Sequence, residues 1–375
     1  MAHEELKERI EELEAELKGT KVNKKTEMAV GQLKAKISKL KEELEVKLSS
    51  GGKGGEGFAV KKEGDATVGF LGKPSVGKST LLGACTNKES KIGAYEFTTL
   101  DVIPGLLHYK HTNLQLLDLP GIIDKAADNR GFGKKVLSVV RACDLVVFVL
   151  DSRFVLEEME MLLTETHKAG LRFNSMRPNL EINKTHKGGV SVPLNNSKET
   201  VPYELIEQVM SDLKFTNVEV IIHERNLNVE DFVDACYGNL QYSHGVICIN
   251  KLDLFSHDEI REKIALLKEK YPDYAITGVS ADKKLNLDGF KEFVWTQLGF
   301  MHVYLKERKS EPDFEKPLVV ERFDNVKRVC EKIHRSMFEK FRFAKIKGDS
   351  VKFDWQQVGL EHRVEPGDII EIFQR

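Results

Sequence analysis

The sequence contains no long apolar run, no clustered cysteines and no strong excess of charge of either sign. No stretch approaches the ~18 apolar residues of a membrane-spanning helix, and the first residues lack the basic-then-apolar layout of a secretory signal. We therefore expect a cytoplasmic protein without membrane association. The five cysteines include no C-x-x-C pair, which argues against a zinc site or a disulfide framework and fits reduced thiols. With a formal net charge of −2, any basic surface for nucleic acid must be local.

The chain is long enough for several domains, because 375 residues exceed one ordinary domain and 41% of them are hydrophobic. Leucine and isoleucine recur at helical spacing over 4–17 and 24–48, which predicts a helical hairpin over residues 1–50. Four lysines of its second helix fit either a solvated face or an RNA contact; they are Lys34, Lys36, Lys39 and Lys41. A glycine-rich linker is expected over 51–63.

From residue 64 onward strands and helices alternate, which predicts an α/β fold with a parallel sheet and helices on both faces. Buried strands are expected at 145–150 and 245–250. They are separated by about three times the ~30 residues of one strand–helix–strand unit, so we expect an inserted α+β subdomain. The predicted sheet domain covers 64–171 and 239–300, and the insert covers 172–238, with a hairpin at 180–194. An α+β module is predicted over 301–375. We expect few core contacts across the proline-marked boundary at 306–317.

A phosphate-binding loop is predicted at Gly72–Ser79, which fits G-x-x-x-x-G-K-[ST] between an expected strand and an expected helix. Glycines let backbone N–H groups and a helix N-terminus surround an anion. Lys78 would add charge for the β- and γ-phosphates, and the Ser79 hydroxyl would bind Mg²⁺. The predicted nucleotide-binding residues here are Gly72, Lys73, Pro74, Ser75, Val76, Gly77, Lys78, Ser79 and Thr80.

Two weaker motifs follow, each of which could also be an ordinary turn or strand end. Asp118 and Gly121 form a D-x-x-G pattern, in which the carboxylate approaches Mg²⁺ and the glycine N–H faces the γ-phosphate. A threonine between the two loops would complete the Mg²⁺ shell when a γ-phosphate is present; we favour Thr99, with Thr98 as second choice. The predicted catalytic residues are Lys78, Thr99 and Gly121, and the predicted metal ligands are Ser79, Thr99 and Asp118.

The sharpest motif is Asn250-Lys251-Leu252-Asp253, at the carboxyl end of an expected buried strand, where open α/β sheets bind ligands. The Asp253 carboxylate can accept hydrogen bonds from the N1–H and 2-amino groups of guanine. Adenine offers neither and would leave the carboxylate unpaired. Asn250 would tie the motif to the phosphate loop, the Lys251 stem would cover the base, and Ser280-Ala281 would offer a backbone N–H to guanine O6.

These motifs make the chain resemble the developmentally regulated GTP-binding proteins, which are Obg-like, translation-factor-related P-loop GTPases. The resemblance spans nearly the whole chain, and it is carried by the hairpin, Gly55–Phe58, Gly64–Ala66, Pro74–Thr80, Ala94–Leu100 and Leu116–Ile123. It implies that the insert is a ribosomal-protein-S5-like subdomain and that the C-terminal module is a β-grasp TGS domain. It also implies ribosome and RNA partners and a small stabilising partner protein.

The function predicted from motifs and resemblance is a Mg²⁺-dependent GTPase that hydrolyses GTP to GDP and phosphate and acts as a ribosome-associated, translation-related switch. The alternative is a ribosome- or RNA-binding adaptor in which guanine nucleotide is mainly structural. Ile122 keeps this alternative open, because other GTPases place a water-orienting glutamine there. Slow intrinsic hydrolysis is therefore expected. Related cation-dependent GTPases carry asparagine at the position of Ser75, which leaves a requirement for K⁺ undecided.

The C-terminal module is locally basic, which fits either a solvated helix face or a ribosome or RNA contact. The residues concerned are Lys327, Arg328, Lys332, His334, Arg335, Lys340, Arg342, Lys345 and Lys347. The resemblance favours the RNA contact.

Overall fold

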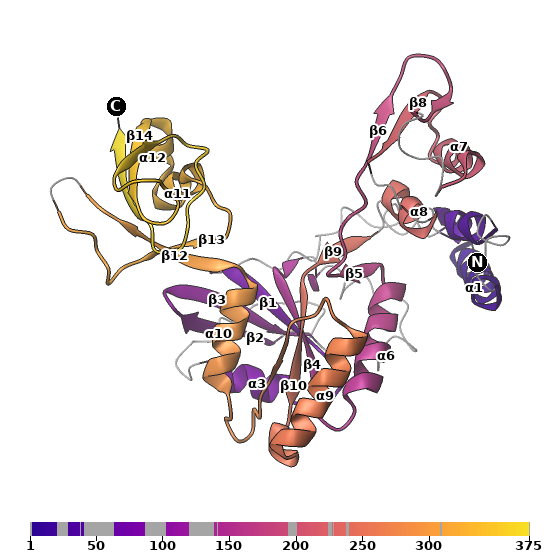
Figure 1. The fold of residues 1–375 in the computed structure, drawn as a ribbon. Coiled ribbons are helices and arrows are strands. Elements are labelled where there is room, and N and C mark those ends of the chain that lie inside the picture. Colours follow the sequence, from indigo (N-terminus) through magenta and orange to yellow (C-terminus); the bar gives the residue numbers. More distant parts are fainter. Residues whose placement is uncertain are drawn as a thin grey trace. The chain divides into compact units, whose positions relative to one another are not determined.

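The computed structural model describes residues 2–20, 29–37, 39–40, 64–86, 103–119, 139–140, 142–193, 201–223, 227, 229–237, 240–307 and 310–374. The predicted linker and the residues Thr98, Thr99, Gly121 and Ile122 lie outside this set. The chain divides into two compact units, Met1–Phe58 with Gly170–Tyr242, and Ala59–Ala169 with Ser243–Arg375 (Figure 1). In the part that the structure describes, no helix is both long and apolar enough to cross a membrane.

The second unit is built on a six-stranded sheet, and it confirms the predicted α/β fold. The strand order is β11 (Ile276–Gly278), β10 (Gly245–Asn250), β4 (Leu145–Asp151), β1 (Ala66–Leu71), β3 (Thr112–Asp118) and β2 (Ile103–Tyr109). All neighbours are parallel except β2 and β3, which form an antiparallel hairpin. Every residue of β1, β4 and β10 is buried, as expected for apolar strands covered on both faces.

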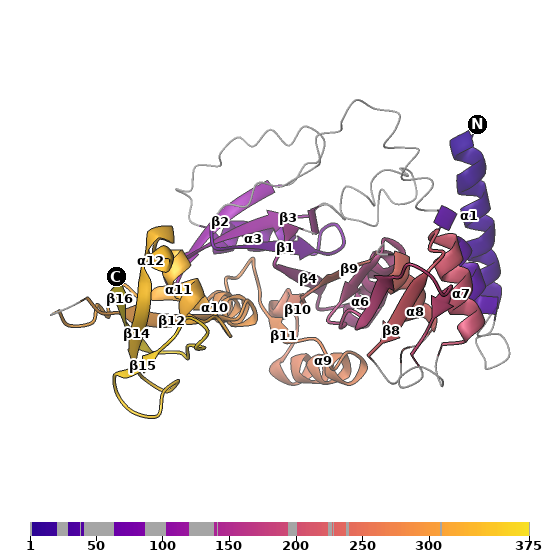
Figure 2. The ribbon, with the colours of Figure 1, turned by 90° about the horizontal axis from the view of Figure 1, so that it is seen from above.

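Two pairs of helices pack on this sheet. One pair is α3 (Lys78–Cys85) with α10 (Leu287–Gln297), and the other is α6 (Val155–Lys168) with α9 (His257–Lys270). The Phe290 ring of α10 meets the buried Phe70 ring of β1 edge-on, with ring centres 6.1 Å apart. Viewed from above, β1 and β3 again run side by side, which agrees with their pairing (Figure 2).

The first unit joins the N-terminal helices to the insert. It contains α1 (Ala2–Gly19), a helical segment over 29–37, β5 (Leu171–Phe173), β6 (Leu180–Lys184), β7 (Val190–Ser191), α7 (Tyr203–Asp212), β8 (Val218–Ile222), α8 (Val229–Tyr237) and β9 (Gln241–Ser243). Ala35 lies in the insert's core, and a Cβ on Gly31 would come within 2.5 Å of Val229. The Lys39 ammonium donates to the Asp212 carboxylate at 2.8 Å, so this lysine is part of an intramolecular contact.

The predicted hairpin over 180–194 is wrong. Strands β6 and β7 do not pair with each other, because β8 lies between them, antiparallel to β6 and parallel to β7. The Gly188-Gly189 turn, with both φ values positive, does reverse the chain. The two strands then pair with opposite edges of β8, whose alternating buried residues lie in the insert's core.

The C-terminal module is a five-stranded sheet in the order β13 (Leu318–Glu321), β12 (Phe300–Leu305), β16 (Ile369–Gln374), β14 (Phe341–Lys347) and β15 (Gln356–Val358). Two helices, α11 (Val326–Ile333) and α12 (Arg335–Glu339), accompany it. Val326 and Val329 of α11 pack with Ala344, Ile346 and Ile370 of the strands in one buried cluster.

Of the residues beyond the 306–317 boundary, Val319 reaches the core of the sheet domain, and strand β12, which precedes this boundary, pairs within the module's sheet. Phe300 and Val319 belong to the core of the six-stranded sheet domain, together with Trp295 of α10. Strand β12 begins directly after Gly299, whose φ of 72° turns the chain out of α10. Because no spacer separates the helix from the strand, the first residue of β12 stays in the neighbouring core.

Phe300→Ala should therefore destabilise the sheet domain as well as the module. The ring is 7% exposed, and truncating a buried phenylalanine costs about 3–5 kcal/mol. The matched control is Phe323→Ala, because that ring is 71% exposed and its loss should change stability by no more than about 0.5 kcal/mol. Urea unfolding followed by circular dichroism compares them, and equal midpoints for the two variants would contradict the shared core.

Candidate functional site

The residues singled out from the sequence gather at the carboxyl edge of the six-stranded sheet. Gly72–Thr80 joins β1 to α3, Asp118 ends β3, Asn250 ends β10, and Ser280-Ala281 follow β11. Parallel strands place their carboxyl ends at the same edge, so segments separated by more than 200 residues meet there. Thr98, Thr99 and Gly121 are outside the described residues, and their positions stay predictions.

Both loop glycines are required by close approach. A Cβ on Gly72 would lie 2.4 Å from the Val149 carbonyl oxygen, and a Cβ on Gly77 would lie 2.4 Å from Asn250 Nδ2. Gly77 also has a φ of 96° and precedes the first residue of α3. The loop thus turns directly into a helix N-terminus, where free N–H groups favour an anion.

Lys78 places a positive charge under this loop. Its side chain is 7% exposed, and Nζ donates to the carbonyl oxygens of Gly72 at 3.1 Å and Lys73 at 3.0 Å. These contacts hold the ammonium inside the curve of the loop, where it can neutralise the charge of a bound polyphosphate.

Ser79 and Asp118 meet across the loop. The Ser79 hydroxyl donates to Asp118 Oδ2, while the other carboxylate oxygen, Oδ1, is buried without a hydrogen-bond partner among the described residues. A buried carboxylate oxygen without a donor is costly unless a cation or its water satisfies it. The pair therefore fits a Mg²⁺ site that uses oxygen ligands.

Asn250 links three segments through one buried side-chain amide. Its Nδ2 donates to the Val76 carbonyl at 2.8 Å, and its Oδ1 accepts from the backbone N–H groups of Lys251 at 2.8 Å and Ala281 at 3.0 Å. The link to the phosphate loop is the one that the sequence predicts. The neighbouring N–H, that of Ser280, donates to the Leu285 carbonyl at 3.2 Å.

Asp253 lies exposed at this edge, in the short helix η1 (Leu252–Leu254). The buried Ser280 hydroxyl donates to its Oδ1 and fixes the orientation of the carboxylate. Lys251 has a left-handed backbone with a φ of 64°, and its ammonium donates to the Ser75 carbonyl at 2.9 Å. The lysine stem thereby runs between the phosphate loop and the Asp253 segment.

A charged network at the end of β4 was not found from the sequence. The Lys251 ammonium also donates to Asp151 Oδ2 at 2.7 Å, and Arg153 donates to both Asp151 oxygens at 2.9 and 2.7 Å. The hydrogen bonds from Arg153 and Lys251 hold the pKa of Asp151 far below its ordinary value, against the opposing effect of burial. The signal that could have found it is the Asp-x-Arg sequence directly after a fully buried strand at the ligand-binding edge.

Glu158 in the first turn of α6 extends this network to the phosphate loop. Its carboxylate accepts from the Asp151 backbone N–H at 2.9 Å, and Lys73 Nζ approaches it at 4.0 Å. Burial raises the pKa of Glu158, and both contacts oppose that rise.

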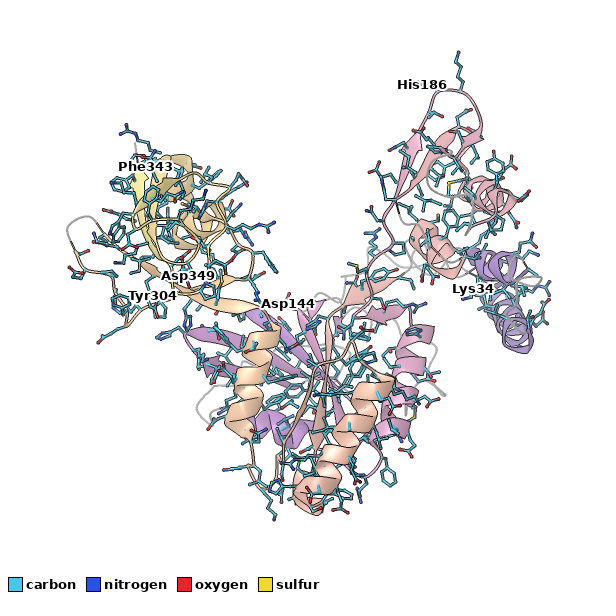
Figure 3. The ribbon with its side chains drawn as sticks, viewed as in Figure 1. Lys34, Asp144, His186, Tyr304, Phe343 and Asp349 are labelled. Carbon is cyan, nitrogen blue, oxygen red and sulfur yellow. The ribbon has the colours of Figure 1, made fainter. Side chains whose placement is uncertain are left out.

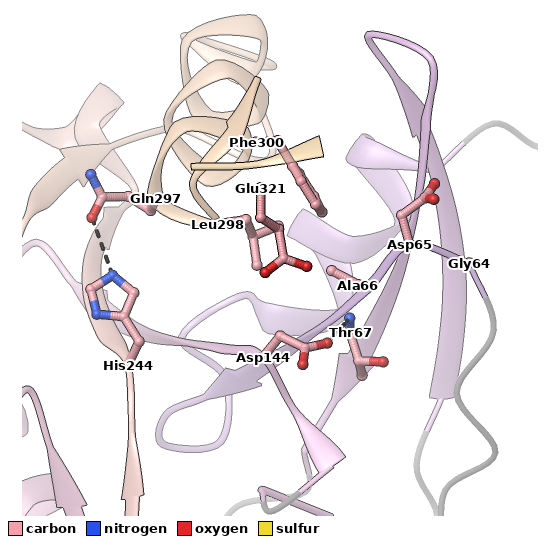
Figure 4. Close-up of a pocket in the computed structure, with 10 residues that line it drawn as sticks. All are labelled: Gly64, Asp65, Ala66, Thr67, Asp144, His244, Gln297, Leu298, Phe300 and Glu321. Atoms are coloured by element: carbon pink, nitrogen blue, oxygen red, sulfur yellow. Dashed lines mark hydrogen bonds between the residues drawn. The ribbon is translucent and has the colours of Figure 1, made fainter. Parts of the chain in front are cut away.

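A cavity of about 510 Å³ lies at the opposite, amino-terminal edge of the sheet and is separate from this site (Figure 4). Its polar walls are engaged in the fold, since Asp144 Oδ2 accepts from the Thr67 N–H at 2.9 Å and His244 contacts Gln297 at 3.3 Å. The cavity therefore lies beside the first residues of β1, β4 and β10, and hydrogen bonds of the fold engage these polar groups.

Comparison with known proteins agrees with the geometry. Residues 67–179 match the family described as 50S ribosome-binding GTPase, residues 187–300 match the C-terminal region of that domain, and residues 301–374 match the TGS domain. An uncharacterized GTP-binding protein of Methanocaldococcus jannaschii is 41% identical over 98% of this chain and 92% of its own length. GTP-binding protein 1 of Schizosaccharomyces pombe is 38% identical over 97% of this chain and 98% of its own.

A mammalian relative extends the likeness. Developmentally-regulated GTP-binding protein 2 of Mus musculus is 38% identical over 98% of this chain and 99% of its own length. The phosphate loop, the Asn250 motif and the TGS module are thus those of a P-loop GTPase that binds guanine nucleotide. The chain belongs to the family of developmentally regulated GTP-binding proteins.

Proposed function

We propose that this GTPase is Mg²⁺-dependent and acts on the ribosome as a translation-related switch. The observation that carries the proposal is the convergence of Lys78, the Ser79–Asp118 pair and Asp253 at one sheet edge, tied together by Asn250. Such a site can hold the phosphates, the metal and the base of one nucleotide at the same time.

The loop N–H groups and Lys78 bind the β- and γ-phosphates, and Asp253 accepts from the N1–H and 2-amino groups of guanine. Lys251 covers the base. Ala281 offers its N–H to guanine O6, and since this N–H already donates to Asn250, base binding shares or exchanges that hydrogen bond. Mg²⁺, when bound, stabilises charge on the phosphates. Ser79 and Asp118 would hold it together with Thr99, and the Gly121 N–H would donate to the γ-phosphate.

The ribosome is proposed as partner because the family that matches residues 67–179 is described as ribosome-binding, and because the C-terminal module carries a local basic excess. The proposal includes a small stabilising partner protein, which the family resemblance implies, and a cytoplasmic location, where ribosomes are found. The Ile122 side chain offers no hydrogen bond to the attacking water, which leaves a backbone group, a monovalent cation or a partner to position it. We propose the ribosome or the partner protein as the source of the group that speeds hydrolysis.

Ribosome sedimentation and multiple-turnover hydrolysis test this function together. We expect the full chain to sediment with ribosomes in the presence of a non-hydrolysable GTP analogue more than with GDP, less so as salt rises, and to hydrolyse GTP faster with ribosomes present. Lys78→Ala is the control for dependence on nucleotide. Equal sedimentation in both nucleotide states, without stimulated turnover, would instead support the adaptor with structural nucleotide.

Asp253→Asn should change the base that the site prefers. The amide oxygen can still accept from Ser280, but an NH₂ group now faces the guanine donors, so GTP affinity should fall by about 3 kcal/mol while xanthosine triphosphate binds better. Asp258→Asn is the matched control, because its side chain is 90% exposed on α9. Titration calorimetry measures both nucleotides. Unchanged GTP affinity in Asp253→Asn would remove Asp253 from base recognition.

Asp151→Asn should weaken GTP and GDP binding alike, about tenfold, because the Lys251 ammonium keeps an acceptor but loses its charged partner. Base preference should not change, which separates this positioning role from that of Asp253. Glu160→Gln is the control, since Glu160 also pairs with a lysine, Lys270, but on the helix surface. A tenfold loss for GTP with none for GDP would contradict a role in placing Lys251.

The same variant has a defined pH dependence. A carboxylate with a depressed native pKa stabilises the fold above its unfolded pKa of about 3.9, and this stabilisation is lost as pH falls. The stability difference between wild type and Asp151→Asn should therefore be constant from about pH 8 to pH 5 and shrink below about pH 4.

A further inference from the structure

The sheet of the C-terminal module has one face that α11 and α12 do not cover. Ala344, Ile346 and Ile370 point into the core with α11. Side chains alternate along strands, so Phe343 and Lys345 of β14 and Phe373 of β16 point to the other side. The register confirms this, because Phe343 lies opposite Phe373 and Lys345 lies opposite Glu371. On this side Phe300 and His302, at the start of β12, lie against the sheet domain. We call the remaining part, formed by β14, β16 and the end of β12, the open face.

Aromatic rings gather on the open face. The partly buried rings of Phe343 and Phe373 are stacked, with centres 4.5 Å apart and planes 19° from parallel. On β12, Tyr304 lies opposite Ile369, which places it on the same side as Phe373, and its ring meets Phe314 at 4.9 Å. Figure 3 labels Phe343 and Tyr304 on this module.

The cations of the open face lie against these rings. Lys345 is 5.6 Å from the centre of the Phe373 ring. The register of β14 shifts between Phe341 and Phe343, which interrupts the alternation there, and the Arg342 guanidinium lies 5.6 Å from the centre of the Phe343 ring. Lys306, which follows β12, is 5.4 Å from the Trp355 ring. Glu371, opposite Lys345, subtracts one charge, and the Lys347–Asp354 ion pair, at 2.8 Å, is neutral, so the three cations Arg342, Lys345 and Lys306 leave the face positive.

The helix side of the module is a weaker candidate for a nucleic-acid contact. Arg328 of α11 is paired with Glu331 at 3.0 Å, and Lys332 donates to the Val319 carbonyl at 3.2 Å. Both basic side chains therefore already have partners within the module, which leaves them less available to phosphates. The sequence pointed to the whole basic segment, and the structure separates it into this helix side and the open face.

We propose that the open face binds single-stranded RNA, with bases stacking on the Phe343–Phe373 pair and phosphates contacting Lys345, Arg342 and Lys306. Stacked aromatics beside cations on a sheet are the features that hold unpaired bases and their backbone. A docked protein is less well matched, because lysine is depleted in the buried centres of protein interfaces. The inference deepens the proposed ribosome role, on which it rests for the source of the strand.

The test uses the full chain and a fluorescein-labelled oligouridine of about twelve nucleotides, with an abasic oligomer of equal length as the backbone-only probe. Wild-type protein should bind oligouridine about tenfold more tightly than the abasic oligomer in fluorescence anisotropy. Phe343→Leu combined with Phe373→Leu should abolish this preference. Lys345→Gln should weaken the binding of both probes. It should also reduce the slope of log affinity against log salt concentration by the amount expected for about one phosphate contact.

Arg328→Gln is the matched control on the helix side and should leave both affinities unchanged. GTP affinity and the thermal midpoint report whether each variant is folded, and the comparison of the two probes on wild-type protein needs no variant. Equal affinity for both probes, or undiminished preference in the leucine variant, would overturn the proposal. So would loss of ribosome binding in that variant with RNA binding intact, since the face would then dock a protein.

The two proposals fail separately. Oligouridine binding without ribosome-stimulated turnover would remove the proposed switch and leave the open face as an RNA site. Stimulated turnover without a preference for bases would do the reverse.

Discussion

One buried side-chain amide, that of Asn250, holds the nucleotide site in shape. It connects the phosphate loop at Val76, the base motif at Lys251 and the following strand end at Ala281. An unsatisfied buried amide costs about 1–3 kcal/mol per lost partner, so the three segments are favoured in one arrangement. A Cβ at residue 77 would lie only 2.4 Å from Nδ2 of the same amide. Packing against Asn250 therefore requires Gly77 as much as phosphate binding does.

The charged network adds a second set of ties at the same edge. The Lys251 ammonium donates to the Ser75 carbonyl and to the Asp151 carboxylate, to which Arg153 also donates. Glu158 connects the end of β4 to Lys73. The phosphate loop is thus anchored at residues 73, 75 and 76 by Glu158 of α6, by Lys251 and by Asn250 of β10, and Asp151 of β4 supports Lys251. A loop held in this way loses little freedom when it closes around an anion, which favours affinity.

Prediction from the sequence succeeded where a motif and a strand end coincide. Gly72–Ser79, Asp118 and Asn250 could be placed together because parallel strands bring their carboxyl ends to one edge. Asp151 was missed because its role depends on Lys251, a partner 100 residues away that a local pattern does not reveal. The position of β8 between β6 and β7, and the packing of Ala35 in the insert's core, were missed for the same reason. Short strands and small apolar residues do not specify their distant partners.

The join between the sheet domain and the TGS module decides how a ribosome contact would act on the enzyme. Phe300 and Val319 lie in the sheet domain's core, and His302 contacts the Lys110 carbonyl in the turn between β2 and β3. Detaching the module would expose Phe300, and burial of a phenylalanine side chain is worth about 1.5–3 kcal/mol, so the attached arrangement is favoured. An RNA strand bound to the open face would consequently orient the sheet domain with it, rather than hold it on a loose tether. The turn that His302 touches leads into β3, whose last residue is Asp118, so the module contacts the hairpin that carries the proposed Mg²⁺ ligand.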